Sequence, residues 1–332
     1  MLMRDFEVVE QPIRLKGLTE RLSKEGIEFM ESRKKDKIPF FLVLSYTHVH
    51  TAIEVAEEFR GRTKHGRYGD AVEELDSGIG KVMASLQNLE LADNTIVYFT
   101  SDNGGHKEER GLNGEIDGGY NGIFKGGKAQ GAVEGAIRVP SAVKWPGKIP
   151  AGTTVDEPTW QMDMFTTMAN VMNISVPMER QIDGQNLLPL LSGQEKISPH
   201  EYFVHYCGED VHAVRYRPRA GRKVWKLVYN TPNYLPGQDT CEYLCSCQSS
   251  ITLDPPVLYE LTSDPGERQP IKTSTSKEYQ EIANKINMAL HHHKDGIVPV
   301  EKQFSLHNLW WQPRLQICCN FPICECIDSK YS

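Results

Sequence analysis

Apolar residues in the first hundred positions follow two kinds of pattern. In residues 18–34 (LTERLSKEGIEFMESRK) and 70–91 (DAVEELDSGIGKVMASLQNLEL) they recur every three or four positions, which predicts two amphipathic helices. Two continuous apolar runs, 38–46 (IPFFLVLSY) and 96–100 (IVYFT), are typical of strands that are covered on both faces. The alternation of helix and strand predicts an α/β fold whose sheet is at least partly parallel.

The pattern changes after the second apolar run. Residues 104–136 contain many glycines, too many for regular structure, and predict an ordered functional loop. Strand patterns dominate the later part of the chain, followed by a helix over 277–293 and a cysteine-rich tail. We therefore expect two domains: an α/β domain over 1–195, and a smaller C-terminal α+β subdomain with an antiparallel sheet over 196–332.

Composition and charge exclude some classes of function. The chain has 332 residues, 39% hydrophobic and 24% charged, as in ordinary globular proteins. Its net charge of -7 argues against nucleic acid as a partner, because phosphate binding requires a basic face. The longest apolar run, 38–46, is far shorter than the roughly 20 residues of a membrane helix. The start, MLMRDFEVVEQ, has acidic residues where a signal peptide is apolar. We expect neither a membrane span nor a signal peptide in this sequence.

The cysteines are crowded into the C-terminal third of the chain. They are Cys207, Cys241, Cys245, Cys247, Cys318, Cys319, Cys324 and Cys326. An even number with this placement predicts disulfides made in an oxidising compartment. The alternative is a zinc site in CEYLCSC or CCNFPICEC, although these spacings differ from the usual C-x-x-C knuckle. The sequon Asn173-Ile174-Ser175 predicts glycosylation at Asn173 and is compatible with secretion.

Both predicted strands end in polar residues. One run leads into THVH, with His48 and His50, and the other into SDN, with Asp102 and Asn103. In an open α/β sheet, ligands bind outside the carboxyl ends of the strands. The carboxylate and amide oxygens of Asp102 and Asn103 suit Ca²⁺ or Mg²⁺, although the same residues also suit a simple turn. Because side chains alternate on an extended chain, one histidine would face the crevice and could act on a substrate oxygen.

The segment 122–138, GIFKGGKAQGAVEGAIR, favours an anion-binding loop. It matches G-x-x-x-x-G-K up to Lys128, but Ala129 stands where a P-loop has the Ser or Thr that holds Mg²⁺. The approach, GGYN, is also not a strand, so the segment fails as a P-loop. A glycine loop that presents Lys125 or Lys128 to an anion, with Arg138 nearby, agrees with the same residues.

Together these motifs resemble the sulfatase family, in its branch of steroid sulfatase and arylsulfatases D, E, F and H. PFFLVLSYTHVHTA, HGRYGDAVEELD, IVYFTSDNGGH, GGYNGIFKGGKAQGAVEGAIRVP and IDGQNLLPLL occur in the family's order and spacing, over nearly the whole chain. The resemblance implies an alkaline-phosphatase-like α/β sheet sandwiched by helices, incomplete here, with a smaller C-terminal α+β subdomain. It also implies hydrolysis of aryl or steroid sulfate esters.

The resemblance implies roles for individual residues. Asp102 and Asn103 look like the last two protein ligands of a catalytic Ca²⁺, whose site would be incomplete in this chain. His50 resembles the histidine that contacts the sulfate ester near the leaving oxygen, and Lys128 resembles the sulfate-binding lysine. Other charged residues of the loop look structural: Lys125, Glu134 and Arg138. The implied disulfides are Cys207–Cys247, Cys241–Cys245, Cys318–Cys324 and Cys319–Cys326.

The sequence departs from the family by an absence. The family's nucleophile is a formylglycine made from a cysteine in C-x-P-S-R, and an Asp-Asp pair supplies further metal ligands. Neither motif occurs here. We expect the chain to be the C-terminal part of a longer enzyme, as a fragment, a truncated gene model or a short isoform, and to be inactive alone. The parent would belong to the secretory pathway (endoplasmic reticulum, Golgi, lysosome or secreted), with the branch's membrane hairpin upstream of residue 1.

Two alternatives to a sulfuric ester hydrolase stay open. One is a truncated, catalytically inactive sulfatase-like protein that binds a partner or an anion without turnover, because the nucleophile motif is missing. The other is a phosphodiesterase or phosphatase of the same wider superfamily, which would need more Asp and His ligands after residue 103 than we find. The expected partner in the leading interpretation is a small-molecule sulfate ester.

Overall fold

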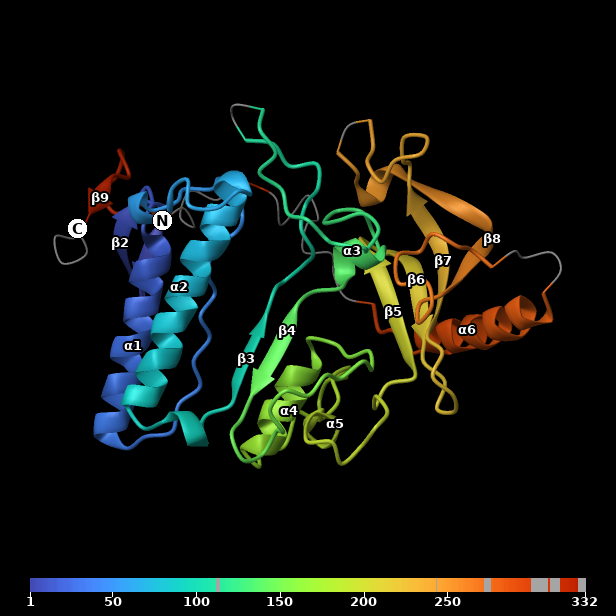
Figure 1. Cartoon of the computed structure of the whole chain (residues 1–332), viewed down its shortest axis with the longest axis horizontal. Coiled ribbons are helices and arrows are strands. Elements are labelled where there is room, and N and C mark those ends of the chain that lie inside the picture. The colour runs from blue at the N-terminus through green and yellow to red at the C-terminus, as the bar shows by residue number, and fades with distance from the viewer. Residues whose placement is uncertain (112–113, 243, 272–275, 300–309, 311–316, 328–332) are drawn as a thin grey trace. The chain divides into compact units, whose positions relative to one another are not determined.

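The chain divides into two compact units. The structure is a computed structural model, and it describes residues 1–111, 114–242, 244–271, 276–299, 310 and 317–327. Unit 1 consists of Met1–Leu89 with Ile297–Ser332, and unit 2 consists of Glu90–Gly296 (Figure 1). The domain boundary expected near residue 195 stays a prediction.

Unit 1 is built on a pair of helices and a small sheet. Helix α1 spans Leu18–Asp36, α2 spans Gly66–Asn88, and the two lie side by side (Figure 1). Strands β1 (Leu2–Arg4), β2 (Glu7–Gln11) and β9 (Cys326–Ile327) form an antiparallel sheet in the order β1-β2-β9, and a 3-10 turn, η1, covers Glu57–Phe59.

The two helices of unit 1 cross closely at Gly78. A Cβ at this position would lie 2.7 Å from Ser23 Oγ and 3.0 Å from Thr19 Cγ2, so glycine permits the close approach. Helix α2 begins at Gly66, earlier than the start at Asp70 that its sequence predicts. Asp70 lies inside the helix, where its carboxylate accepts hydrogen bonds from backbone N–H groups of the preceding loop.

The apolar run 38–46 is not a strand. It forms no ladder within the described part of the chain, so the strand expected there is wrong. Its side chains nevertheless alternate as on an extended chain. Leu44 and Tyr46 pack on α1, whereas Phe41 and Val43 are 66% and 65% exposed. The segment therefore has one packed face and one apolar face open to solvent.

Unit 2 contains two antiparallel sheets. Strands β3 (Val97–Thr100) and β4 (Ser141–Lys144) form one, and β5 (Tyr202–Cys207), β6 (Asp210–Tyr216), β7 (Trp225–Pro232) and β8 (Ser250–Glu260) form the other in that order. The helices are α3 (Glu134–Ile137), α4 (Asp163–Val171), α5 (Leu188–Leu191) and α6 (Lys277–Asp295), with 3-10 turns η2 (Ala92–Asn94) and η3 (Cys247–Ser249).

Every strand pairing among the described residues is antiparallel, which corrects the expectation of a partly parallel sheet. The physical reason is the behaviour of 38–46. This run would have been the second buried strand of the α/β pattern, and it makes no ladder.

Helix α6 covers one face of the four-stranded sheet. Its buried residues are spaced by three and four positions, and Ile286 packs with Val214, Leu227 and Leu258 in a hydrophobic core. Val228 belongs to a second, smaller core, which the glycine-rich loop enters with an alanine. The sheet thus supports the loop on one side and α6 on the other (Figure 1).

The structure contains four disulfides, and their pairing is the one that the resemblance implies. They are Cys207–Cys247 and Cys241–Cys245 in unit 2, and Cys318–Cys324 and Cys319–Cys326 in unit 1. All eight sulfurs are used, which leaves no thiolate for the alternative zinc site. Over the described ranges, no helix combines the length and apolarity needed to cross a bilayer.

Candidate functional site

The four predicted site residues belong to different units. His50 lies in unit 1, and Asp102, Asn103 and Lys128 lie in unit 2.

Asp102 and Asn103 follow β3 directly, at its carboxyl end. The exposed Asp102 accepts the Asn103 backbone N–H through Oδ1 at 2.9 Å, and Asn103 Nδ2 donates to the Gly104 carbonyl at 3.2 Å. These are local turn bonds, so the interpretation of Asp102 as a turn residue describes the backbone correctly. They leave Asp102 Oδ2 and Asn103 Oδ1 without a hydrogen-bond partner in the described chain.

These two free oxygens fit part of a calcium site. Both are hard ligands at a loop position, but Ca²⁺ takes about six to eight oxygens, so the pair supplies only a fraction of a shell. Among the described residues, the one cluster with ligand atoms close enough for a metal is Glu108 with Cys241 and Cys245. Its two sulfurs are joined in a disulfide, so this cluster does not compete for the same role.

The glycine-rich loop holds Lys128 next to the end of β3 through the backbone. Gly104 N–H donates to the Ala136 carbonyl at 2.9 Å, and Lys128 N–H donates to the Gly105 carbonyl at 3.2 Å. The residue after Asn103 is thus bonded to one end of the loop, and the next residue is bonded to Lys128 itself. The structure thus joins Lys128 to the segment that follows Asn103, although the sequence places these two residues more than twenty positions apart.

The side chain of Asn121 forms hydrogen bonds with the backbone of two other parts of this loop. Its Nδ2 donates to the carbonyls of Gly105 at 2.9 Å and Gly126 at 2.8 Å, and its Oδ1 accepts the Gly105 N–H at 2.8 Å. All of these groups are backbone polar groups that would otherwise need water. Asn121 was not among the predicted site residues; its only signal in the sequence was its place inside GGYNGIFKGGK.

Several glycines of the loop are required by backbone-to-backbone packing. A Cβ at Gly104 would lie 1.8 Å from the Gly135 carbonyl oxygen, and one at Gly135 would lie 2.3 Å from the Gly126 carbonyl oxygen. Gly126 also has a φ of 67°, in the left-handed region. The high glycine content therefore reflects tight packing rather than freedom to move.

A buried ion cluster anchors the far end of the loop to the four-stranded sheet. Lys226 Nζ lies 2.8 Å from Glu134 Oε1 and 2.8 Å from Glu267 Oε1, and Arg215 also pairs with Glu134. Glu267 in turn accepts the Glu134 N–H at 2.7 Å. Burial alone would raise the pKa of the Glu134 carboxyl, but the positive charges of Arg215 and Lys226 outweigh it and hold that pKa below its ordinary value.

His205 on β5 belongs to the surroundings of this cluster. Burial lowers the pKa of its imidazole well below the ordinary value, and the neighbouring Arg215 and Lys226 lower it further. Its Nε2 is buried without a hydrogen-bond partner in the described structure. His205 is therefore a neutral histidine in the folded protein at neutral pH.

In unit 1, the two histidines of THVH have different surroundings. The His48 side chain is buried, and its Nε2 lies 3.3 Å from Glu74 Oε2 without making a hydrogen bond. His50 is exposed, and its Nδ1 contacts the Thr51 carbonyl. The arrangement has one packed and one outward histidine, and His50 is the one able to meet a ligand.

Asn173, the predicted glycosylation site, lies just after α4. It is exposed, with a φ of 55°. Its glycosylation stays a prediction.

Comparison with known families and proteins gives the same family for the early and the later part of the chain. Residues 5–174 match the model described as "Sulfatase", and residues 198–326 match "C-terminal region of aryl-sulfatase". Human steryl-sulfatase is 43% identical over 99% of this chain and 57% of its own length. Human arylsulfatase H is 42% identical over 98% of the chain and 58% of its length. The chain thus spans little more than half of the curated relatives it matches.

A solved structure agrees on the fold. The PsFucS1 sulfatase from Pseudoalteromonas sp. superposes with a TM-score of 0.74, over 87% of this chain and 55% of that chain. Its sequence identity is 23%, so the likeness concerns the fold, and the expected sulfatase-type α/β architecture is confirmed.

Proposed function

This chain belongs to the sulfatase family, and on that premise we propose that it carries part of the active site of an arylsulfatase-type sulfuric ester hydrolase. The proposed substrates are small-molecule aryl or steroid sulfate esters. The proposed site in unit 2 is the polar end of β3 with the lysine of the glycine-rich loop, and the proposed residue in unit 1 is His50.

One observation supports the proposal most strongly. Asp102 and Asn103 present two unpartnered oxygens, and the next two residues are hydrogen-bonded to the loop that bears Lys128. Two ligand oxygens and one cation held by the same backbone suit a ligand that has negative charge and needs a metal. A sulfate ester has this character.

The residues of the proposed site would have different roles in the reaction. Asp102 and Asn103 would hold part of a Ca²⁺ shell, and the bound ion would supply positive charge against the sulfate oxygens and the nucleophile. Lys128 would lie against the sulfate group and stabilise charge that grows there in the transition state. His50 would act at the ester oxygen, where a proton is needed as the alcohol departs.

We also propose that the chain by itself does not turn over sulfate esters. The sequence has no C-x-P-S-R motif, and its first cysteine is the disulfide-bonded Cys207, so it supplies no precursor of a formylglycine nucleophile. The second candidate function, favoured by the same absence, is binding of an anion without catalysis. The disulfides support a location of the parent in the secretory pathway.

Calorimetric titration of the 332-residue chain with inorganic sulfate, in the presence of Ca²⁺, tests the proposed site. We expect saturable binding that weakens about tenfold or more in Lys128→Ala and in Asp102→Ala, because each removes a charge-assisted contact. Lys148→Ala is the matched control: this exposed lysine of unit 2 should leave the affinity unchanged. Equal affinities for all three variants and the wild type would overturn the assignment.

A turnover assay with 4-methylumbelliferyl sulfate separates the two candidate functions. We expect no hydrolysis above background by the purified chain, because the nucleophile is missing. Measurable turnover that disappears in Asp102→Ala would show that the chain is a complete catalyst and would reject this part of the proposal.

A further inference from the structure

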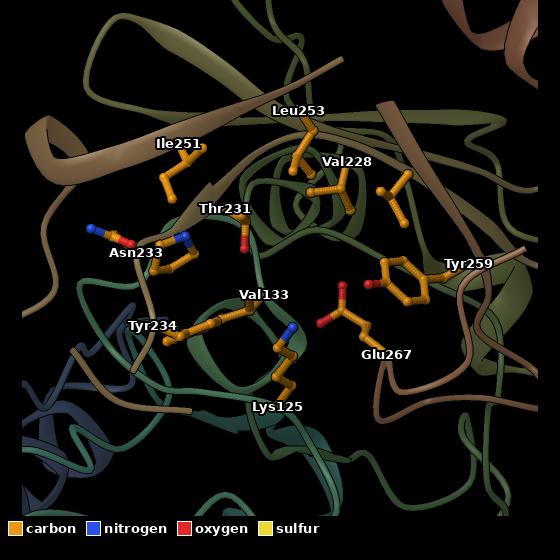
Figure 2. A pocket seen from close by; sticks show the side chains of 12 residues that line it. Lys125, Val133, Val228, Thr231, Asn233, Tyr234, Ile251, Leu253, Tyr259 and Glu267 are labelled. Carbon is orange, nitrogen blue, oxygen red and sulfur yellow. The ribbon is translucent and has the colours of Figure 1, made fainter. Parts of the chain in front are cut away.

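Unit 2 has a cavity that is lined by none of the residues assigned to the sulfate site, Asp102, Asn103 and Lys128. Its volume is about 320 Å³, and it lies between β7, β8 and the glycine-rich loop. Apolar side chains form much of its wall, including Val133, Val228, Leu253 and Val257. Figure 2 shows Lys125, Thr231, Tyr259 and Glu267 pointing toward the same space from different segments.

The charges around this cavity do not cancel. Lys125 and Glu267 are the charged residues of its lining. The Glu267 carboxylate is already satisfied, because Oε1 pairs with Lys226 at 2.8 Å and Oε2 accepts the Glu134 N–H at 2.7 Å. Lys125 has no carboxylate within ion-pair distance in the described chain. One positive charge in the cavity therefore lacks a counter-charge.

The position of Lys125 is fixed by an aromatic ring. Its Nζ lies 5.1 Å from the centroid of the Tyr234 ring, a cation–π contact. The ring is itself held in place, since the Tyr234 hydroxyl donates to Gln130 Oε1 at 3.0 Å. The cation is thus directed into the cavity by packing rather than by an acidic partner.

Two hydroxyl groups lie beside this cation. The hydroxyls of Thr231 and Tyr259 point into the cavity and have no hydrogen-bond partner in the described structure (Figure 2). Burial, with the nearby negative charges of Glu267 and Asp264, raises the pKa of Tyr259 to about 12. The Tyr259 hydroxyl therefore stays protonated at neutral pH, and its unused hydrogen-bond donor suits an anionic oxygen.

We propose that this cavity binds a small amphipathic organic monoanion, an aliphatic carboxylate. Its carboxylate would lie at Lys125 Nζ and the Tyr259 hydroxyl, and its apolar chain would lie against Val228 and Leu253. A group with one negative charge neutralises the single uncompensated cation, and an aliphatic chain matches the wall. The proposal goes beyond the sulfate site, and it does not depend on it.

The occupant would contact the loop that also carries Lys128. Lys125 is the first lysine of KGGK, and the Lys125 carbonyl accepts the Gly135 N–H at 2.7 Å. The proposed ligand would therefore bind to the same tightly packed loop as sulfate, three positions before Lys128.

Titration of the 332-residue chain with octanoate, by calorimetry in sulfate-free buffer, tests the proposal. We expect one saturable site, with octan-1-ol bound about tenfold or more weakly because it lacks the charge. Lys125→Met should weaken octanoate binding by about tenfold or more, and the exposed Lys148→Met should not change it. An absence of saturable octanoate binding, or equal binding by Lys125→Met, would overturn the proposal.

Nuclear Overhauser effects on the wild-type chain give a readout that does not depend on a variant that folds. Contacts between the octanoate methylene protons and the methyl groups of Val228 and Leu253 are expected. Contacts confined to methyl groups elsewhere would reject the cavity as the site. Lys128→Ala separates this test from that of the sulfate site: it should bind octanoate normally while losing sulfate.

Discussion

Two segments of this protein, residues 38–46 in unit 1 and the glycine-rich loop 104–136 in unit 2, are held in place by different means. The first is apolar and packs one face on a helix, but its backbone joins no ladder in the described chain and Phe41 and Val43 face solvent. The second is rich in glycine, yet its backbone is bonded at Gly104, Gly105 and Lys128.

This difference shows that apolar side chains alone do not determine the conformation of a backbone segment. An apolar segment is specified only when its N–H and C=O groups also find partners. The loop meets this condition through carbonyls, the Asn121 side chain and a buried ion cluster around Glu134. The order of the candidate site therefore rests on polar groups inside unit 2.

The largest expected effect comes from breaking the ion cluster. Glu134→Gln removes the carboxylate between Arg215 and Lys226 and leaves their charges with Glu267 alone. We expect a loss of about 3–5 kcal/mol in the free energy of unfolding, because a buried charge is left uncompensated. Urea unfolding measures it. Glu179→Gln, at an exposed glutamate, is the control, and an equally small loss in both variants would contradict the anchoring role.

Replacing one glycine by alanine in each unit tests whether the two glycines are required by close packing. Gly104→Ala places a methyl group against the Gly135 carbonyl oxygen and should destabilise by about 1–3 kcal/mol. Gly80→Ala lies in α2 of unit 1, where a Cβ meets nothing within 4 Å, and should stabilise by about 0.5–1 kcal/mol through helix propensity. Chemical unfolding of both variants should give opposite signs, and the same sign would contradict the packing described for the loop.

The pH dependence of the free energy of unfolding should reflect the protonation of His205. Because burial lowers its pKa in the folded state, the unfolded chain binds the proton first as pH falls below about 6.5. Stability should therefore decrease with falling pH, at up to about 1.4 kcal/mol per pH unit below 6.5. His212, whose pKa burial also lowers, acts in the same direction. His205→Phe should flatten this slope in urea unfolding at several pH values. An unchanged slope would show that His205 is not buried as neutral imidazole.

The smallest effect is expected at the open face of 38–46. Val43→Thr changes an exposed side chain that contributes little packing, so the free energy of unfolding should change by less than about 0.5 kcal/mol. Thermal and urea unfolding check this. A loss near 2 kcal/mol would mean that this face is covered in solution.

Much of the fold could be predicted because helices carry their own signal. The periodic patterns of α1 and α6 predicted both elements, since an amphipathic helix needs only one buried face. The same local reasoning gave a strand at 38–46, and it was wrong because a strand requires partners that a local pattern does not contain. The start of α2 was misjudged for a similar reason: Asp70 accepts hydrogen bonds from backbone N–H groups of the preceding loop, and the helix begins earlier, at Gly66.

In the candidate site, too, some residues could be predicted from the sequence and others could not. Asp102, Asn103 and Lys128 stood out because their residue types and motifs carry chemistry. Lys226 and Glu267 did not, although they fix the loop, because they lie about ninety and more positions from Glu134. Lys226 also resembles an ordinary polar position within a strand pattern. Long-range charge pairs of this kind leave no local signal in a sequence.

A single NMR titration tests the central claim that the loop holds Asn103 and Lys128 as parts of one anion site. Inorganic sulfate would be added to the deuterated, ¹⁵N-labelled chain in the presence of Ca²⁺. The account predicts that the backbone amides of Asn103, Gly104, Gly105 and Lys128 shift together, with one shared dissociation constant. Shifts at Lys128 without Gly104 and Gly105, different dissociation constants for the two segments, or no response from either would contradict it.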